Sequence, residues 1–192
     1  MAKQVAAGKV RVIGGKWRGR RLPLADAAIR PTADRVRETL FNWLDPHLRG
    51  ANVLDLFAGS GALGFESASR GAANVVLVEK SRGTAEHLRT LVAELDAAEV
   101  TVRNEEARRY LASPDRLPAR QYDVVFLDPP FAGHELAELC SHLEQGSWLS
   151  PTAHVYLEMA SNTEFPDLPE KWLLLKNKTA GQVCYALARR EA

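Results

Sequence analysis

The fold is decided by Asp55-Leu56-Phe57-Ala58-Gly59-Ser60-Gly61-Ala62-Leu63-Gly64, ten residues that end a β-rich run and open a helical one. Gly59, Gly61 and Gly64 satisfy the spacing G-x-G-x-x-G, in which glycines allow a tight turn and a close approach of the backbone to a ligand. An acid, Glu79, follows Gly59 by 20 residues at the end of the next β-rich run. The combination predicts the nucleotide-binding edge of an α/β sheet.

Outside this stretch, short β-rich runs alternate with amphipathic helical ones, the clearest of which covers residues 83–97. Alternation of this kind predicts a parallel sheet with helices on both faces. The β-rich runs are 52–57, 74–79, 100–103, 122–128 and 154–158.

The end of the chain has a different pattern. Two strand-like runs, 172–176 and 182–188, are joined through residues 179–181, which leaves no room for a crossover helix. Strands joined so closely pair antiparallel. We therefore expect an antiparallel closure of the sheet.

The glycine loop leaves two ligand classes open. A dinucleotide site binds a pyrophosphate at the helix N-terminus and a ribose on the acid. S-adenosylmethionine has an adenosine but no phosphate, and it carries a sulfonium and an ammonium group. A carboxylate at Asp55 would repel a pyrophosphate but attract the ammonium group, and Glu79 is placed to accept hydrogen bonds from both ribose hydroxyls. Asp55 therefore favours S-adenosylmethionine.

A second motif, Asp128-Pro129-Pro130-Phe131, ends the fourth β-rich run of the alternating region. Its two prolines remove two amide donors, so the carbonyls of Asp128 and Pro129 are rigid acceptors beside a carboxylate. Such acceptors suit the amino group of a nucleic-acid base, on which positive charge grows as a methyl group arrives. Phe131 offers a flat face for the base. The motif predicts methyl transfer to an exocyclic amine by direct displacement, for which alignment supplies most of the acceleration.

A weaker signal follows the third β-rich run, at Asn104-Glu105-Glu106-Ala107. A polar side chain here could meet an adenine amino group. Two acids that open a helix are equally well explained by its positive N-terminal end. Both interpretations stay open for Glu106 and Ala107.

Other kinds of catalytic machinery are not indicated. The five histidines (47, 87, 134, 142 and 154) lack metal-ligand spacing, so no metal is expected. Cys140 falls within an expected helix away from any strand end, which argues against a cytosine-C5 nucleophile. Cys140 and Cys184 are too few for a disulfide framework and are expected to be small buried residues.

Charge is unevenly distributed in a chain whose formal net charge is only +1. Residues 1–49 carry 11 Lys and Arg against 4 acids, whereas the remainder carries 14 against 20. The segment KVRVIGGKWRGRRL at 9–22 predicts a short basic hairpin or loop. Thr32 is expected to cap a helix that runs over Val36 and Leu40 and ends near Pro46. A basic N-terminal part predicts contact with a polyanion, although a merely solvated basic face is the alternative.

With these motifs in place, the sequence resembles the RsmD-type 16S ribosomal RNA guanine-N2 methyltransferases of bacteria. The glycine loop and the Asp-Pro-Pro-aromatic motif belong to a broad superfamily of amino methyltransferases, and the other segments are more specific. Those segments are Arg11-Val12-Ile13-Gly14-Gly15-Lys16-Trp17-Arg18-Gly19, Arg30-Pro31-Thr32, 34–44 and Ala180-Gly181-Gln182-Val183.

The resemblance implies a Rossmann-like class I methyltransferase with a seven-stranded, mostly parallel sheet whose last strand is antiparallel. It implies that the substrate is a guanine of 16S RNA, usually numbered 966, in the assembled small (30S) subunit. The chain would divide into a basic extension, 1–30, and a catalytic domain, 31–192.

The resemblance also assigns residues. Asp128 and Pro129 would hold the guanine amine and Phe131 the ring. The cofactor would be S-adenosylmethionine, bound by Thr32, Arg35, Asp55, Phe57, Gly59, Ser60, Gly61, Glu79, Glu106 and Ala107. RNA would contact Lys16, Trp17, Arg18, Arg20, Arg21 and Lys178. Glu106 departs from the Asn or Asp expected before Ala107.

Three alternative functions remain. A DNA adenine-N6 or cytosine-N4 methyltransferase shares the second motif but usually carries a sizeable target-recognition region, and no insert here is large enough. A dinucleotide oxidoreductase is the alternative reaction class. A non-catalytic ribosome-assembly factor would be favoured by a broken glycine loop or a replaced Asp128, and both are intact. Apolar runs are too short for a membrane helix, so we expect a cytoplasmic, monomeric protein without a membrane partner.

Overall fold

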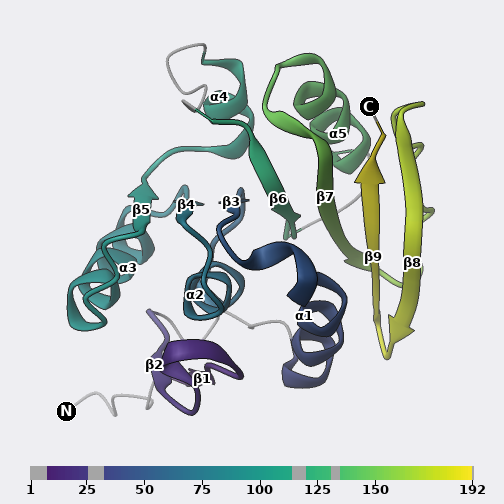
Figure 1. The fold of residues 1–192 in the computed structure, drawn as a ribbon. Helices are drawn as coiled ribbons and strands as arrows, with labels where there is room; N and C mark the ends of the chain where they lie inside the picture. Colours follow the sequence, from purple (N-terminus) through teal and green to yellow (C-terminus); the bar gives the residue numbers. More distant parts are fainter. Residues whose placement is uncertain (1–7, 26–32, 114–119, 131–134, 192) are drawn as a thin grey trace, which may run out of the picture.

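The computed structural model describes residues 8–25, 33–113, 120–130 and 135–191. Two sheets are formed (Figure 1). The small one pairs β1 (Lys9–Arg11) with β2 (Arg21–Pro23) in antiparallel register, which confirms the expected hairpin. The large one has seven strands in the order β5-β4-β3-β6-β7-β9-β8.

The large sheet confirms the expected fold class. Its first five strands along the chain pair parallel, and β9 pairs antiparallel with both β7 and β8. The last strand in sequence therefore lies inside the sheet, between two earlier ones. The strands are β3 (Asn52–Asp55), β4 (Asn74–Val78), β5 (Val100–Arg103), β6 (Tyr122–Leu127), β7 (Leu149–Ala160), β8 (Trp172–Ala180) and β9 (Val183–Arg190).

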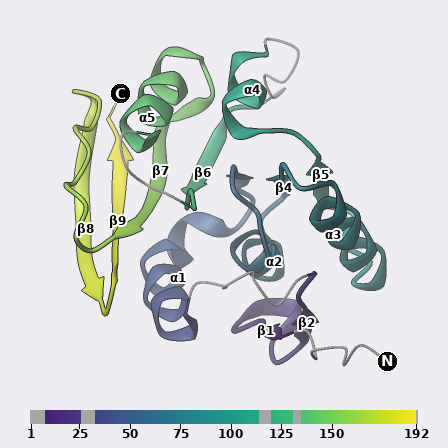
Figure 2. The ribbon, with the colours of Figure 1, turned by 180° about the vertical axis from the view of Figure 1, so that it is seen from behind.

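Helices cover both faces of the sheet (Figures 1 and 2). One hydrophobic cluster joins the sheet to α1 (Asp34–Leu48), α2 (Ala62–Ser69), α3 (Arg82–Glu94) and the hairpin. The other cluster joins the opposite face to α4 (Ala107–Ala112) and α5 (Glu135–Gln145). This three-layer arrangement is the one that strand and helix alternation predicts.

The bounds of α1 differ from the expectation at the C-terminal end. Pro46 lies inside the helix, which continues to Leu48. The stop is supplied by Gly50, whose φ of 76° is the left-handed conformation that commonly follows a helix. The N-cap position is Ala33, which makes no side-chain cap hydrogen bond, and Thr32 lies outside the described residues.

The hairpin is held to the rest of the fold by a fully buried carboxylate, Glu66 of α2. Its oxygens accept the backbone N–H groups of Ile13 (2.7 Å) and Gly14 (2.8 Å) and the Arg70 Nε (2.7 Å). Arg37 of α1, also buried, donates to the Arg11 carbonyl (2.9 Å). Charged side chains of two helices thus hydrogen-bond the hairpin backbone directly.

The turn of the hairpin contacts the far end of α2. The Trp17 N–H donates to the Ser69 Oγ at 2.9 Å, and Ser69 is the last residue of the helix. Because α2 begins at the glycine loop and rises about 1.5 Å per residue, this contact lies roughly 12 Å from that loop. Figure 1 shows β1 and β2 against α2. The expected division of the chain into a basic extension, 1–30, and a catalytic domain, 31–192, stays a prediction.

Within the described residues, helices are too short or too polar to cross a membrane.

Candidate active site

The carboxyl ends of β3, β4 and β6 bring three predicted acids to one edge of the sheet. Asp55 ends β3 and pairs with Leu77 of β4 on one side and Phe126 of β6 on the other. Glu79 directly follows β4, and Asp128 directly follows β6. Open α/β sheets bind their ligands at this edge. The structure thus places the acids of both motifs at the same edge, at the ends of three adjacent strands.

Each glycine of the loop has a separate role. Gly61 has φ 73° at the N-cap of α2, and a Cβ there would lie 2.7 Å from the Phe65 ring. A Cβ on Gly64 would lie 2.1 Å from a methyl of Leu77, so this glycine permits close packing of helix on strand. A Cβ on Gly59 would meet nothing closer than 3.8 Å. Only Gly59 therefore leaves open space for a ligand to approach the backbone.

Glu79 links two loops of the site. One carboxylate oxygen accepts the Gly59 N–H at 3.0 Å, and the other accepts the Ser81 N–H at 2.7 Å. Each carboxylate oxygen can accept more than one donor, so the expected ribose hydroxyls can bind alongside these amides. The acid therefore holds the glycine loop in place before any ligand arrives.

Asp55 is a buried acid whose hydrogen bonds, from the Phe57 and Gly64 amides, offset its burial only in part. It is 2% exposed and accepts the Phe57 N–H at 3.3 Å. Burial raises the pKa of Asp55 from 3.8 to about 7, a rise that the Phe57 amide opposes and the nearby Glu79 carboxylate reinforces. Binding of a cation beside Asp55 would favour its charged form. The site thus fits a ligand with an ammonium group.

We expect the affinity for S-adenosylmethionine to rise with pH up to about 7, because binding of its ammonium group must displace the proton that Asp55 holds. The expected slope below this pKa approaches a factor of about 10 per pH unit. Calorimetric titrations from about pH 5 to 6.7 stay about one unit or more below the pKa of an α-amino group, about 7.7–8.0, so the slope reports Asp55. Asp55→Asn should flatten the profile, and a wild-type affinity independent of pH would refute the assigned contact.

The second motif is only partly described. Asp128 is half-buried and Pro129 is buried, whereas Phe131 lies outside the described residues. Arg35 is exposed in the first turn of α1. Phe57 and Ser60 belong to the loop between β3 and α2, where the Ser60 Oγ accepts the Ala62 N–H at 3.3 Å.

Glu106 caps a helix. As the N-cap residue of α4, its carboxylate accepts the N–H groups of Arg108 (3.2 Å) and Arg109 (3.0 Å). Ala107 is the buried first residue of that helix. The helix-capping interpretation therefore accounts for the position of Glu106, and a contact with adenine stays a prediction.

The predicted RNA-binding residues separate into two groups. Arg18, Arg20, Arg21 and Lys178 are exposed, and the Lys178 Nζ lies 5.8 Å from the centre of the Trp43 ring. Trp17 is only 8% exposed and packs edge-on against Phe65, with ring centres 6.4 Å apart.

Trp17 is therefore a core residue that docks the hairpin, and its buried ring gives no support to the expected contact with RNA. Lys16 lies over this ring, 4.3 Å from its centre, and forms an ion pair with Glu99. Lys16 is exposed, so its expected contact with RNA stays a prediction. The burial of Trp17 follows from the packing of the hairpin turn onto α2.

Sequence reasoning did not single out Glu158, although it ended a predicted strand. Glu158 is 8% exposed, and its Oε2 accepts the Tyr156 hydroxyl at 2.6 Å. The buried acid near the end of an otherwise apolar strand was the available signal. Cys140, by contrast, lies fully buried in α5 as expected, and burial raises the pKa of its thiol to about 12.

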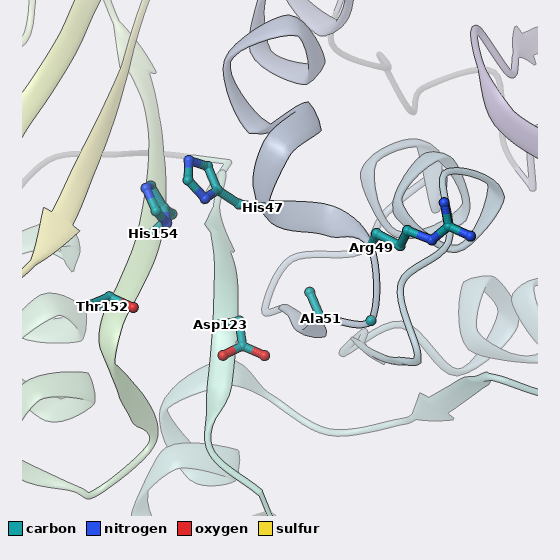
Figure 3. Close-up of a pocket in the computed structure, with 7 residues that line it drawn as sticks. His47, Arg49, Ala51, Asp123, Thr152 and His154 are labelled. Atoms are coloured by element: carbon teal, nitrogen blue, oxygen red, sulfur yellow. The ribbon is translucent and has the colours of Figure 1, made fainter.

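A polar pocket lies at the other edge of the sheet, where β3, β6 and β7 begin (Figure 3). The rings of His47 and His154 stack there with centres 4.0 Å apart. Burial, with the nearby His47 and Arg189, lowers the pKa of His154 to about 4, so the ring is neutral near pH 7. The pocket is separate from the acids described above. Its lining consists of His47, Arg49, Gly50, Ala51, Asp123, Thr152 and His154.

Comparisons with known proteins agree over nearly the whole chain. Residues 10–189 match the family described as Conserved hypothetical protein 95. A protein of Escherichia coli named Ribosomal RNA small subunit methyltransferase D is 45% identical over 187 residues, which cover 97% of this chain and 92% of that one.

Solved structures show the same fold. A putative methyltransferase, yhhF, from Escherichia coli superposes with a TM-score of 0.88 at 44% identity and covers 96% of this chain and 99% of its own. An RNA methyltransferase from Salinibacter ruber, solved with S-adenosyl-L-homocysteine, has a TM-score of 0.61 at 17% identity, with 84% and 94% covered. At that identity the likeness concerns the fold alone.

Proposed function

We propose a specific reaction for this chain, from the premise that it belongs to the Conserved hypothetical protein 95 family, which includes the ribosomal RNA small subunit methyltransferases D. The chain methylates RNA of the small ribosomal subunit and uses S-adenosylmethionine as cofactor. The finer proposal is that the acceptor is the exocyclic N2 amine of a guanine in 16S rRNA, at position 966. The observation that carries the proposal is the juxtaposition of Asp55 and Glu79 with Asp128 at one edge of the sheet.

The residues at the cofactor end of the site fit S-adenosylmethionine in charge. Asp55 would bind the ammonium group, Glu79 the ribose hydroxyls, and the open backbone at Gly59 the amino-acid moiety. When bound, the cofactor supplies a methyl group on a cationic sulfur, which keeps the electron pair of the broken carbon–sulfur bond.

The residues proposed to hold the base that accepts the methyl group belong to the second motif. The Asp128 carboxylate and the Pro129 carbonyl accept the two N–H groups of the amine and aim its lone pair at the methyl group. Positive charge that develops on the nitrogen is stabilised by the preplaced carboxylate. The same carboxylate takes the proton that the amine must lose, directly or through water. Phe131 is proposed to stack on the base.

The RNA surface is proposed to include the exposed Arg18, Arg20 and Arg21, together with the exposed Lys178 of β8. Contacts of this type neutralise phosphates and are independent of sequence. The hairpin backbone is fixed by Glu66 and Arg37, so these arginines are presented on a rigid support.

The test is a methyl-transfer assay with labelled S-adenosylmethionine and three substrates in parallel: small subunits that lack the modification, naked 16S RNA and duplex DNA. The methylated nucleoside is then mapped by mass spectrometry. We expect N2-methylguanosine in 16S RNA, with small subunits as the better substrate. Transfer only to DNA, or a methylated adenine, would overturn the proposal, and calorimetry with NADH would expose a dinucleotide enzyme.

A further inference from the structure

Glu158 lies beside Asp128 on the neighbouring strand. Strands β6 and β7 are parallel, and Leu127 pairs with Leu157 at the end of β6, so the next residue of each strand is Asp128 and Glu158. Side chains that are level on adjacent strands point to the same face, and the strand backbones lie about 4.8 Å apart. Two acids therefore stand next to each other at the edge where the acceptor base is expected.

Glu158 is oriented by Tyr156, two residues earlier on the same face of β7. The Tyr156 hydroxyl donates to the Glu158 Oε2 at 2.6 Å, and the tyrosine is fully buried. Burial, together with the negative charges of Glu158 and Asp128, holds the pKa of Tyr156 well above its usual value. The hydroxyl therefore keeps its proton and acts as a donor. A carboxylate has acceptor capacity for further donors beside this one.

Guanine presents a donor next to its amine. Its N1–H and N2 amino group lie side by side on the Watson–Crick edge, whereas N1 of adenine and N3 of cytosine are acceptors. A carboxylate beside the amine site would accept the guanine N1–H. With adenine or cytosine it would face the lone pair of N1 or N3, and no proton would lie between the two acceptors. A second acid at this point thus distinguishes guanine from the other bases that carry an exocyclic amine.

We propose that Glu158 is the residue that selects guanine, by accepting its N1–H while Asp128 and Pro129 hold the N2 amine. The proposal rests on the proposed guanine-N2 activity and deepens it. Asp128 by itself cannot distinguish guanine, because adenine and cytosine also have an exocyclic amino group that donates hydrogen bonds. Tyr156 is a positioning residue, because it acts on the base only through Glu158.

The test compares small subunits in which the target guanosine is intact or replaced by 2,6-diaminopurine riboside. This analogue keeps the N2 amine, but its N1 is an acceptor. A site built to bind a donor rejects such an analogue strongly, since its buried acceptor is left unpaired. We expect the wild type to favour guanine by at least about 100-fold in kcat/KM.

Glu158→Gln should reduce this ratio at least tenfold, because the amide can donate to N1 of the analogue or accept from N1–H of guanine. Tyr156→Phe should reduce it less, by loosening Glu158. Glu170→Gln, an exposed substitution outside the site, should leave the ratio unchanged. Cofactor affinity, measured by calorimetry, reports whether each variant is folded.

The outcomes separate the two proposals. If Glu158→Gln lowers activity on both substrates by the same factor, the acid has a structural role and the inference is wrong, while the guanine-N2 function stands. Equal use of both substrates by the wild type would also refute it. Should the wild type give no N2-methylguanosine at all, the proposed function itself fails.

Discussion

Asp128→Ala is expected to abolish measurable methyl transfer while the affinity for S-adenosylmethionine stays nearly unchanged. The carboxylate is proposed to act on the acceptor amine, and loss of one preplaced group that stabilises developing charge typically costs about 100- to 1,000-fold in kcat. The proposed cofactor contacts lie on other strands, at Asp55, which ends β3, and at Glu79, which follows β4. Single-turnover experiments with labelled cofactor measure the rate of methyl transfer, and calorimetry measures the affinity for S-adenosylmethionine.

The matched control is Asp123→Asn, at the opposite end of the same strand. Asp123 accepts the Asn52 N–H at 2.9 Å, a contact that an asparagine oxygen can keep. This variant should retain near-normal turnover. A collapse of cofactor binding in Asp128→Ala would mean that Asp128 belongs to the cofactor end of the site.

The second large effect is on stability, at Glu66. Glu66→Ala would leave Arg37 buried beside an empty space and would remove the acceptor of two hairpin amides, Ile13 and Gly14. Loss of one partner from a buried ionic network typically destabilises by about 3–5 kcal/mol. Arg37 keeps Asp34 as an ion-pair partner at 2.6 Å, so we expect the lower end of this range. Urea unfolding followed by circular dichroism measures the change in the free energy of unfolding.

Asp45→Ala provides the comparison for Glu66→Ala. Asp45 forms an ion pair at 3.0 Å with Arg70, which also binds Glu66, but the Asp45 side chain is 67% exposed. Exposed ion pairs contribute about 0–1 kcal/mol, so this variant should unfold almost like the wild type. Similar losses in the two variants would show that Glu66 is not the anchor of the hairpin.

Sequence patterns predicted the central fold well, because strand and helix periodicities there coincide with burial. The runs that became β3 to β6 follow from the alternation of β-rich and helical segments, and the antiparallel closure follows from the short connection between the last two runs. The end of α1 was harder to predict from the sequence. Pro46 is a strong breaker in isolation, yet the last turn tolerates it, and Gly50 sets the actual end.

The site was predictable where a motif carries its own chemistry. Asp55, Glu79 and Asp128 lie together as expected, since parallel strands end at a common edge. The hairpin contacts were not predictable, because Glu66 meets Ile13 and Trp17 meets Phe65 only through packing of segments about 50 residues apart. A tryptophan flanked by bases looks like a nucleic-acid contact in sequence, and its burial depends on where α2 lies.

The interior position of β9 has a consequence for how the chain folds during synthesis. Strand β8 hydrogen-bonds only to β9 within the large sheet, and β9 alone separates it from β7. Until the ribosome has released the segment Val183–Arg190, β8 has no partner and β7 has an unpaired edge. Domains generally fold as units and N-terminal parts emerge first, so sheet completion must wait for these late residues. A nascent chain stalled before them would expose two strand edges that invite aggregation.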